Sequence, residues 1–109
     1  YFGGVIPFLA NRFDATYHML RGINFVKDLK SEPTQLLKNI YVDTSGDTTK
    51  ANFSAALELF GPKHILWGSD YPAKKEPQIS INAIRSLGLS ENDEDNILGE
   101  NLQSLFNKV

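Results

Sequence analysis

The chain has 109 residues, of which 41% are hydrophobic and 22% are charged, with a formal charge of −2 and no cysteine. This composition is ordinary for one small globular domain and excludes a disulfide-linked fold, a thiolate metal site and a basic nucleic-acid-binding surface. No apolar run approaches the roughly 20 residues of a membrane span, and no charged leader precedes the apolar N-terminus, so we expect a cytoplasmic protein that binds no membrane.

Helices and strands are predicted to alternate along the chain. Apolar spacing and capping residues predict helices at 7–20, 35–37, 49–60, 77–87, 90–98 and 102–106, and β-forming residues predict strands at 40–45 and 64–69. Strands that alternate with helices indicate parallel pairing within βαβ units. Two parallel strands make a poor sheet, because parallel strands are normally buried on both faces within larger sheets. The sequence therefore predicts an α/β chain that holds only part of a sheet.

One carboxylate stands at the end of the second predicted strand. The run Ile65-Leu66-Trp67-Gly68-Ser69-Asp70-Tyr71-Pro72 passes from apolar residues to Asp70, and Pro72 stops the strand. The carboxyl ends of strands are where α/β proteins place ligands and catalytic groups. Asp70 is therefore a candidate catalytic or metal-binding residue, and its alternative role is that of a turn or helix-cap aspartate.

The other polar candidates have structural interpretations. His64 precedes Asp70 by six residues, which is ~20 Å along a strand, so the two side chains are not expected to share a metal. We expect His18 to be a surface or packing histidine on the first helix, Asp43 to cap the turn after the first strand, and Trp67 to pack against a helix. The segment 74–76 is interpreted as a solvated loop.

Four motifs of the chain resemble the amidohydrolase-2 (amidohydrolase-related) family. Residues 1–12 are similar to a pattern of His, any residue, two glycines, two residues, Pro, an aromatic residue and an Arg four residues later. Residues 39–46 and 65–72 resemble the seventh and eighth barrel strands of the family, and residues 99–106 resemble its closing Gly-x-Asn-x-x-x-Leu-Phe helix. The resemblance covers essentially the whole chain. It implies a (β/α)8 TIM-type barrel, of which residues 1–109 are the C-terminal third and a single partial domain.

The resemblance also implies a function for the complete protein. The family includes aminocarboxymuconate-semialdehyde decarboxylase, other carboxy-lyases and hydrolases, and its barrel holds one divalent metal, commonly zinc or manganese. By resemblance, Asp70 is the metal ligand or the proton-handling carboxylate after the eighth strand. Arg12 contacts the carboxylate of a small substrate, in some members across a dimer interface. From local pattern alone, Arg12 is equally a surface residue paired with Asp14 or with solvent.

Two departures from the family pattern affect the prediction. The family's His-x-His metal pair and its further histidine lie in segments that residues 1–109 do not contain. The acid–base histidine of the first motif falls on Tyr1, and a phenol with a pKa near ~10 is not a base at neutral pH. We therefore expect the C-terminal part of a metal-dependent hydrolase or decarboxylase that is inactive alone and holds no metal tightly.

The alternative is a non-catalytic interaction module derived from such a barrel. Two lone strands would expose Ile40, Val42 and Leu66 to water, and each large apolar side chain left exposed forgoes ~1.5–3 kcal/mol. Self-association would bury such residues. We therefore expect a homo-oligomer both for the interaction module and for the C-terminal part of an enzyme.

Overall fold

The fold is built around a very small parallel sheet. A computed structural model describes residues 1–108. Strand β1 (Val42–Asp43) pairs in parallel with strand β2 (Ile65–Leu66), with Val42 opposite Ile65 and Asp43 opposite Leu66. The predicted alternation of helices and strands is confirmed. Both strands are shorter than the predicted 40–45 and 64–69, because each has a single neighbour with which to form a hydrogen-bonded ladder.

Helices surround this sheet in the order in which the chain supplies them. The helical segments are α1 (Ile6–Gly22), α2 (Pro33–Leu37), α3 (Lys50–Phe60), the 3-10 turn η1 (Pro62–His64), α4 (Pro77–Arg85), α5 (Glu91–Asp95), the π turn η2 (Asn96–Glu100) and α6 (Asn101–Phe106). His64, predicted to begin the second strand, lies instead in η1. None of the helices in residues 1–108 combines the length and hydropathy needed to cross a bilayer.

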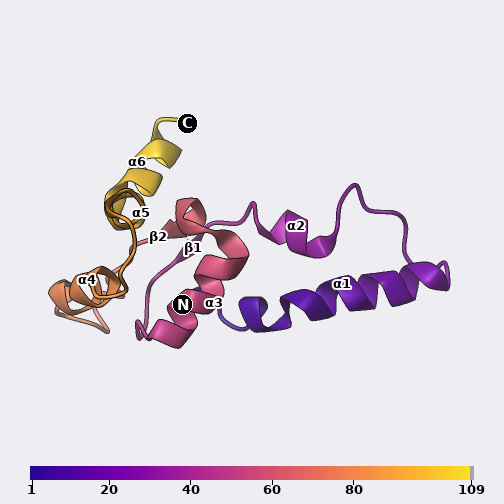
Figure 1. The fold of residues 1–109 in the computed structure, drawn as a ribbon, viewed down its shortest axis with the longest axis horizontal. Coiled ribbons are helices and arrows are strands. Elements are labelled where there is room, and N and C mark those ends of the chain that lie inside the picture. The colour runs from indigo at the N-terminus through magenta and orange to yellow at the C-terminus, as the bar shows by residue number, and fades with distance from the viewer. Residues whose placement is uncertain (109) are drawn as a thin grey trace.

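Helix α1 projects from the rest of the molecule. Its first turn contains Pro7, which costs little there because the first helical N–H groups have no partner within the helix. It contacts only the neighbouring helices α2 and α3 extensively, and Figure 1 shows α1 and α2 extending to the side away from α4. Ala10 is its only buried residue, whereas Phe8 is 87% exposed. The molecule is accordingly elongated, at 51 × 30 × 28 Å.

The hydrophobic core lies between α3, the sheet and the C-terminal helices. Thr49 caps α3 by accepting a hydrogen bond from the Asn52 N–H at 3.2 Å, and Gly61 ends the helix with φ +75°. Helix α3 buries Phe53, Ala56, Leu59 and Phe60, and these meet Val42, Ile65, Ile84 and Ile97. The expected exposure of Val42 is therefore wrong, since Val42 packs into this core, while Ile40 is 42% exposed.

A continuous helical segment closes the fold over β2. Ser90 caps α5 by accepting a hydrogen bond from the Asp93 N–H at 3.1 Å, as the sequence predicts. The predicted break between two C-terminal helices is wrong, because η2 continues α5 into α6. Buried Asn101 donates two hydrogen bonds of 2.8 Å, to the carbonyls of Pro62 and Ile65. The asparagine of the closing motif thus fastens the last helix to the start of β2.

Candidate functional site

The candidate site lies at the carboxyl edge of the sheet, where both parallel strands end. The buried Thr44 N–H donates to the Leu66 carbonyl at 2.9 Å, and the Thr44 hydroxyl accepts from the Gly68 N–H at 3.1 Å. A Cβ at Gly68 would stand 2.9 Å from the Ser45 hydroxyl oxygen. A larger residue at position 68 would therefore require the Ser45 hydroxyl to move, so Gly68 favours the close approach of the two chain segments that leave the strands.

Asp70 occupies a strained position just beyond this contact. It is half-buried and adopts a left-handed backbone conformation with φ +60°, which aspartate tolerates better than most residues. Its carbonyl accepts a hydrogen bond from the Lys74 N–H at 2.9 Å, and the following Tyr71–Pro72 peptide is cis. Within residues 1–108 its carboxylate accepts no hydrogen bond, and the residue at the N-cap of α4 is Glu76. The carboxylate of Asp70 is therefore free of a helix-capping role.

Tyr1, which the resemblance aligns with a histidine of the family motif, lies at the same edge of the sheet. Its ring covers Gly46, where a Cβ would stand 2.8 Å from two ring carbons. The Phe2 N–H donates to the Asp43 carbonyl at 2.8 Å, so the N-terminal segment lies along the exit of β1. The residues after β1, after β2 and at the N-terminus are thus assembled around one corner.

Asp43 caps the turn after β1, as predicted. Its Oδ1 accepts from the Ser45 N–H at 2.8 Å and lies 2.7 Å from the Tyr1 amino group. Burial raises the pKa of Asp43, but the hydrogen bonds from Tyr1 and Ser45 outweigh burial and leave that pKa below its ordinary value. The carboxylate of Asp43 thus closes the turn at Ser45.

Arg12 is not brought to Asp70 by the described part of the chain. It is exposed on α1 and takes part in no hydrogen bond or ion pair among residues 1–108. Of the local alternatives, the pair with Asp14 does not form, because Asp14 accepts hydrogen bonds from the N–H and the hydroxyl of Thr34, at 2.9 and 2.6 Å, whereas contact of Arg12 with solvent agrees with its exposure. Arg12 therefore either contacts solvent alone or has a partner outside residues 1–108.

Both histidines have structural contacts. The Nδ1 of His64 hydrogen-bonds the Phe60 carbonyl at 3.1 Å, and the ring packs edge-to-face on Tyr41 with centroids 4.7 Å apart. The Nε2 of His18 lies 3.0 Å from the Glu32 carboxylate on the surface. Neither of these contacts involves Asp70.

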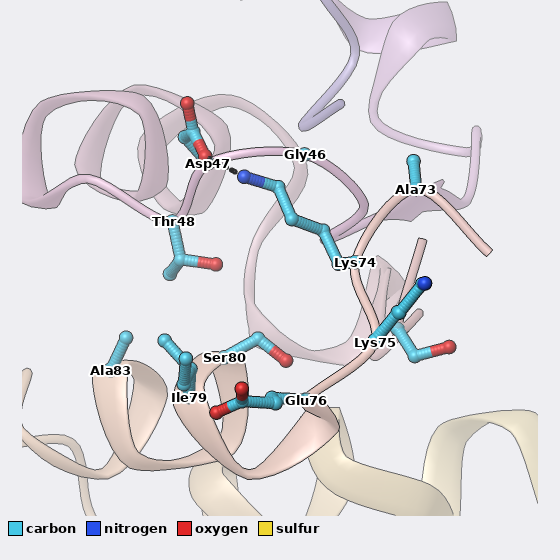
Figure 2. A pocket seen from close by; sticks show the side chains of 11 residues that line it. Gly46, Asp47, Thr48, Ala73, Lys74, Lys75, Glu76, Ile79, Ser80 and Ala83 are labelled. Atoms are coloured by element: carbon cyan, nitrogen blue, oxygen red, sulfur yellow. Dashed lines mark hydrogen bonds and ion pairs between the residues drawn. The ribbon is translucent and has the colours of Figure 1, made fainter. Parts of the chain in front are cut away.

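A cavity of about 470 Å³ adjoins the two loops that leave the strands. Its walls come from the loop after β1, the loop after β2 and helix α4; the lining residues are Gly46, Asp47, Thr48, Ser69, Ala73, Lys74, Lys75, Glu76, Ile79, Ser80 and Ala83. Figure 2 shows Lys74 extended across the space between the loops, toward Asp47, where its Nζ lies 2.5 Å from Oδ1. The interpretation of 74–76 as a solvated loop is therefore incomplete. Twenty-seven residues separate Lys74 from Asp47, and no local pattern signals the pair.

Trp67 directly follows β2 and contacts helix α4. Its Nε1–H donates to the Ser80 hydroxyl at 3.0 Å, and its backbone N–H donates to the Ile97 carbonyl at 2.9 Å. Trp67 thus packs against α4, as the sequence predicts.

The donor set in this part of the molecule is too small for a divalent cation. No group of three His, Cys, Asp or Glu side chains converges within residues 1–108. Asp70 offers one hard oxygen ligand with an unpartnered carboxylate, and three or more protein ligands are usual. Asp70 can therefore complete a metal site only together with ligands from outside this segment.

Two parallel strands joined by a helical crossover, with polar residues at their carboxyl ends, are typical of α/β folds such as the (β/α)8 barrel. The family described as Amidohydrolase matches residues 34–107, more than half of the chain. The chain belongs to this amidohydrolase family.

Solved structures agree with this assignment. Similarity extends to 5-carboxyvanillate decarboxylase from Sphingomonas paucimobilis, with 26% identity and a TM-score of 0.83 over 97% of this chain and 32% of that one. A 2,6-dihydroxybenzoate decarboxylase from Rhizobium matches with 19% identity and a TM-score of 0.78, over 98% of this chain and 33% of that one. A dihydroxybenzoic acid decarboxylase from Polaromonas, with bound manganese and an inhibitor, matches with 22% identity and a TM-score of 0.73, over 97% and 32%.

The chain spans about a third of the length of these structures. The comparison with curated protein sequences gave no match. The predicted fold, the C-terminal third of a TIM-type barrel, is confirmed by the structural matches.

Proposed function

We propose that residues 1–109 are one partial domain, the C-terminal part of a metal-dependent amidohydrolase-family decarboxylase that acts on a small aromatic carboxylate. The observation that carries this proposal is the carboxylate of Asp70, half-buried and unpartnered within residues 1–108, at the carboxyl edge of the sheet. The similarity to 5-carboxyvanillate decarboxylase supports the reaction class. Hydrolysis, the other chemistry implied by the family resemblance, is the alternative reaction.

The proposed catalytic and metal-binding residue is Asp70. A carboxylate at this position supplies one oxygen ligand to a divalent cation, with the remaining ligands provided from outside residues 1–108. A bound cation of this kind polarises a substrate oxygen or acidifies a water molecule. The manganese in the Polaromonas relative supports manganese, and zinc is the other candidate.

The proposed substrate-binding residue is Arg12. A guanidinium matches a carboxylate with two parallel hydrogen bonds. Arg12 is exposed on the projecting helix α1, so we propose that it reaches the substrate in a homo-oligomer, from one subunit to the site of its partner. The protein is proposed to be cytoplasmic.

Metal binding tests the proposal at the level of this chain. Calorimetric titration of residues 1–109 with manganese or zinc is expected to give no tight one-to-one binding, because one ligand is not enough. In the coding sequence, an upstream in-frame extension of roughly 200 residues that carries His-x-His near its start is expected, since a complete barrel needs that length. Tight binding by the isolated chain at a site that includes Asp70 would refute the proposal that the other metal ligands lie outside residues 1–109.

A second candidate function is a self-associating module without catalysis. The observation that favours it is the apolar surface of α1 and its surroundings, where Phe8 is 87%, Met19 62% and Phe25 75% exposed. Sedimentation of residues 1–109 is expected to give an oligomer on this view. A well-folded monomer would exclude the module, whereas the subunit contacts of the proposed enzyme are tested on the complete polypeptide.

A further inference from the structure

Lys74 connects the turn of Asp70 to the loop of the neighbouring strand. Its backbone N–H donates to the Asp70 carbonyl at 2.9 Å, which closes the turn that follows Ser69. Its ammonium group reaches Asp47, in the loop after β1. In Figure 2 the side chain of Lys74 extends from the loop after β2 toward Asp47, while Lys75 leads in another direction. One residue therefore joins both strand exits.

We infer that the Lys74–Asp47 ion pair is a strap that positions Asp70, with Lys74 as a positioning residue for the site of the proposed enzyme. This inference rests on the proposed function for its catalytic consequence. Its structural content, a coupling between the strap and the Asp70 turn, stands on the contacts alone.

The need for a strap follows from the backbone of Asp70. A left-handed conformation at a residue other than glycine is unfavourable, and it persists only when its surroundings hold it. The carboxylate of Asp70 has no hydrogen bond within residues 1–108 to hold it, so the turn is fixed through its carbonyl and through Lys74. The other end of the strap is anchored because Asp47 follows Gly46, which is covered by the Tyr1 ring.

The contact between Lys74 and Asp47 favours the charged form of both side chains. The hydrogen bond and the charge of Asp47 raise the pKa of Lys74, and the charge of Asp70 adds to this effect. The same contact lowers the pKa of Asp47. Lys74 is thus an ammonium facing two carboxylates, Asp47 through a direct contact and Asp70 at longer range.

Residue-resolved hydrogen exchange tests the coupling without any activity. In residues 1–109, or in the longer polypeptide that carries them, Lys74→Met is expected to increase exchange at the Lys74 amide by about two- to fivefold, the range of an exposed ion pair. Exchange at the core amide of Phe53 stays at the wild-type rate. Lys75→Met is the matched control, because it removes the same charge one residue away and belongs to no ion pair among residues 1–108. Lys74→Arg is expected to restore protection.

Asp47→Asn removes the strap from its other end and covers the case in which Lys74→Met does not fold. It is expected to increase exchange at the Lys74 amide by the same factor. The proposed strap would be overturned if the Lys74 amide exchanged at the wild-type rate in both Lys74→Met and Asp47→Asn. It would also be overturned if Lys75→Met increased that rate by the same factor.

Kinetics of the complete enzyme tests the catalytic consequence. Lys74→Met is expected to lower kcat by about two- to fivefold and to leave KM unchanged, because the strap positions Asp70 and does not bind substrate. An unchanged kcat together with faster exchange would confine the strap to a structural role and overturn its positioning of the site. Absence of decarboxylation in the wild-type enzyme would refute the proposed function, whereas the exchange result is independent of it.

Discussion

Asn101→Ala is predicted to destabilise the fold more than any substitution of an exposed asparagine. Asn101 is 7% exposed, and its amide donates to the Pro62 and Ile65 carbonyls at 2.8 Å each. Two hydrogen bonds contribute about 1 kcal/mol each, and the Ile65 acceptor left unpaired in the core adds about 1–2 kcal/mol. The free energy of unfolding is therefore expected to fall by about 3–4 kcal/mol.

Urea denaturation followed by circular dichroism measures this change. With a urea dependence of about 1–2 kcal/mol/M, the midpoint is expected to fall by at least about 1.5 M at an unchanged slope. Asn92→Ala is the matched control, since Asn92 is exposed on α5, and its effect is expected to stay within about 0.5 kcal/mol. A loss below 1 kcal/mol for Asn101→Ala, about the control's size, would refute the claim that this side chain fastens the last helix to β2.

Three further substitutions test the packing that supports the site. Ile84 is fully buried, so Ile84→Ala is expected to lower the free energy of unfolding by about 2–5 kcal/mol in urea, and a loss under 1 kcal/mol would contradict its place in the core. Ser90→Ala removes the cap of α5 and is expected to cost about 1 kcal/mol, measured by thermal denaturation; an unchanged midpoint would contradict the cap. Gly3 and Gly4 both have positive φ, +79° and +59°, but a Cβ at Gly3 would stand 2.8 Å from the Phe60 ring, whereas a Cβ at Gly4 would meet open space. Gly3→Ala is therefore expected to lower the free energy of unfolding more than Gly4→Ala. Equal effects would show that the Phe60 contact carries no cost.

The sequence predicted the order of elements because local signals mark each boundary. Thr49 and Gly61 delimit α3 through a cap and a left-handed glycine, and Ser90 begins α5. The lengths of the strands were not predictable, because a strand extends only as far as its neighbours pair with it. The π turn η2 was not predicted, because the apolar spacing predicted separate helices at 90–98 and 102–106, whereas the contacts of Ile97 and Asn101 with the β2 segment keep residues 99–101 helical.

The candidate site was predictable in part. Asp70 follows a short apolar run and a Gly-Ser pair, which is enough to place it beyond the end of β2. The ion pair between Lys74 and Asp47 was not predictable, because it depends on two loops that only the parallel pairing of β1 and β2 brings together. Arg12 remains a prediction: its motif names it, and no contact within residues 1–108 engages it.

Manganese-dependent release of carbon dioxide from a hydroxylated benzoate, by the complete polypeptide that carries this segment, tests the central claim most directly. The wild-type enzyme is expected to be active, and Asp70→Asn to lose at least about 100-fold in kcat while it keeps the same unfolding midpoint. Activity of Asp70→Asn within threefold of the wild type would contradict the proposed role of Asp70 as the catalytic and metal-binding residue of this site.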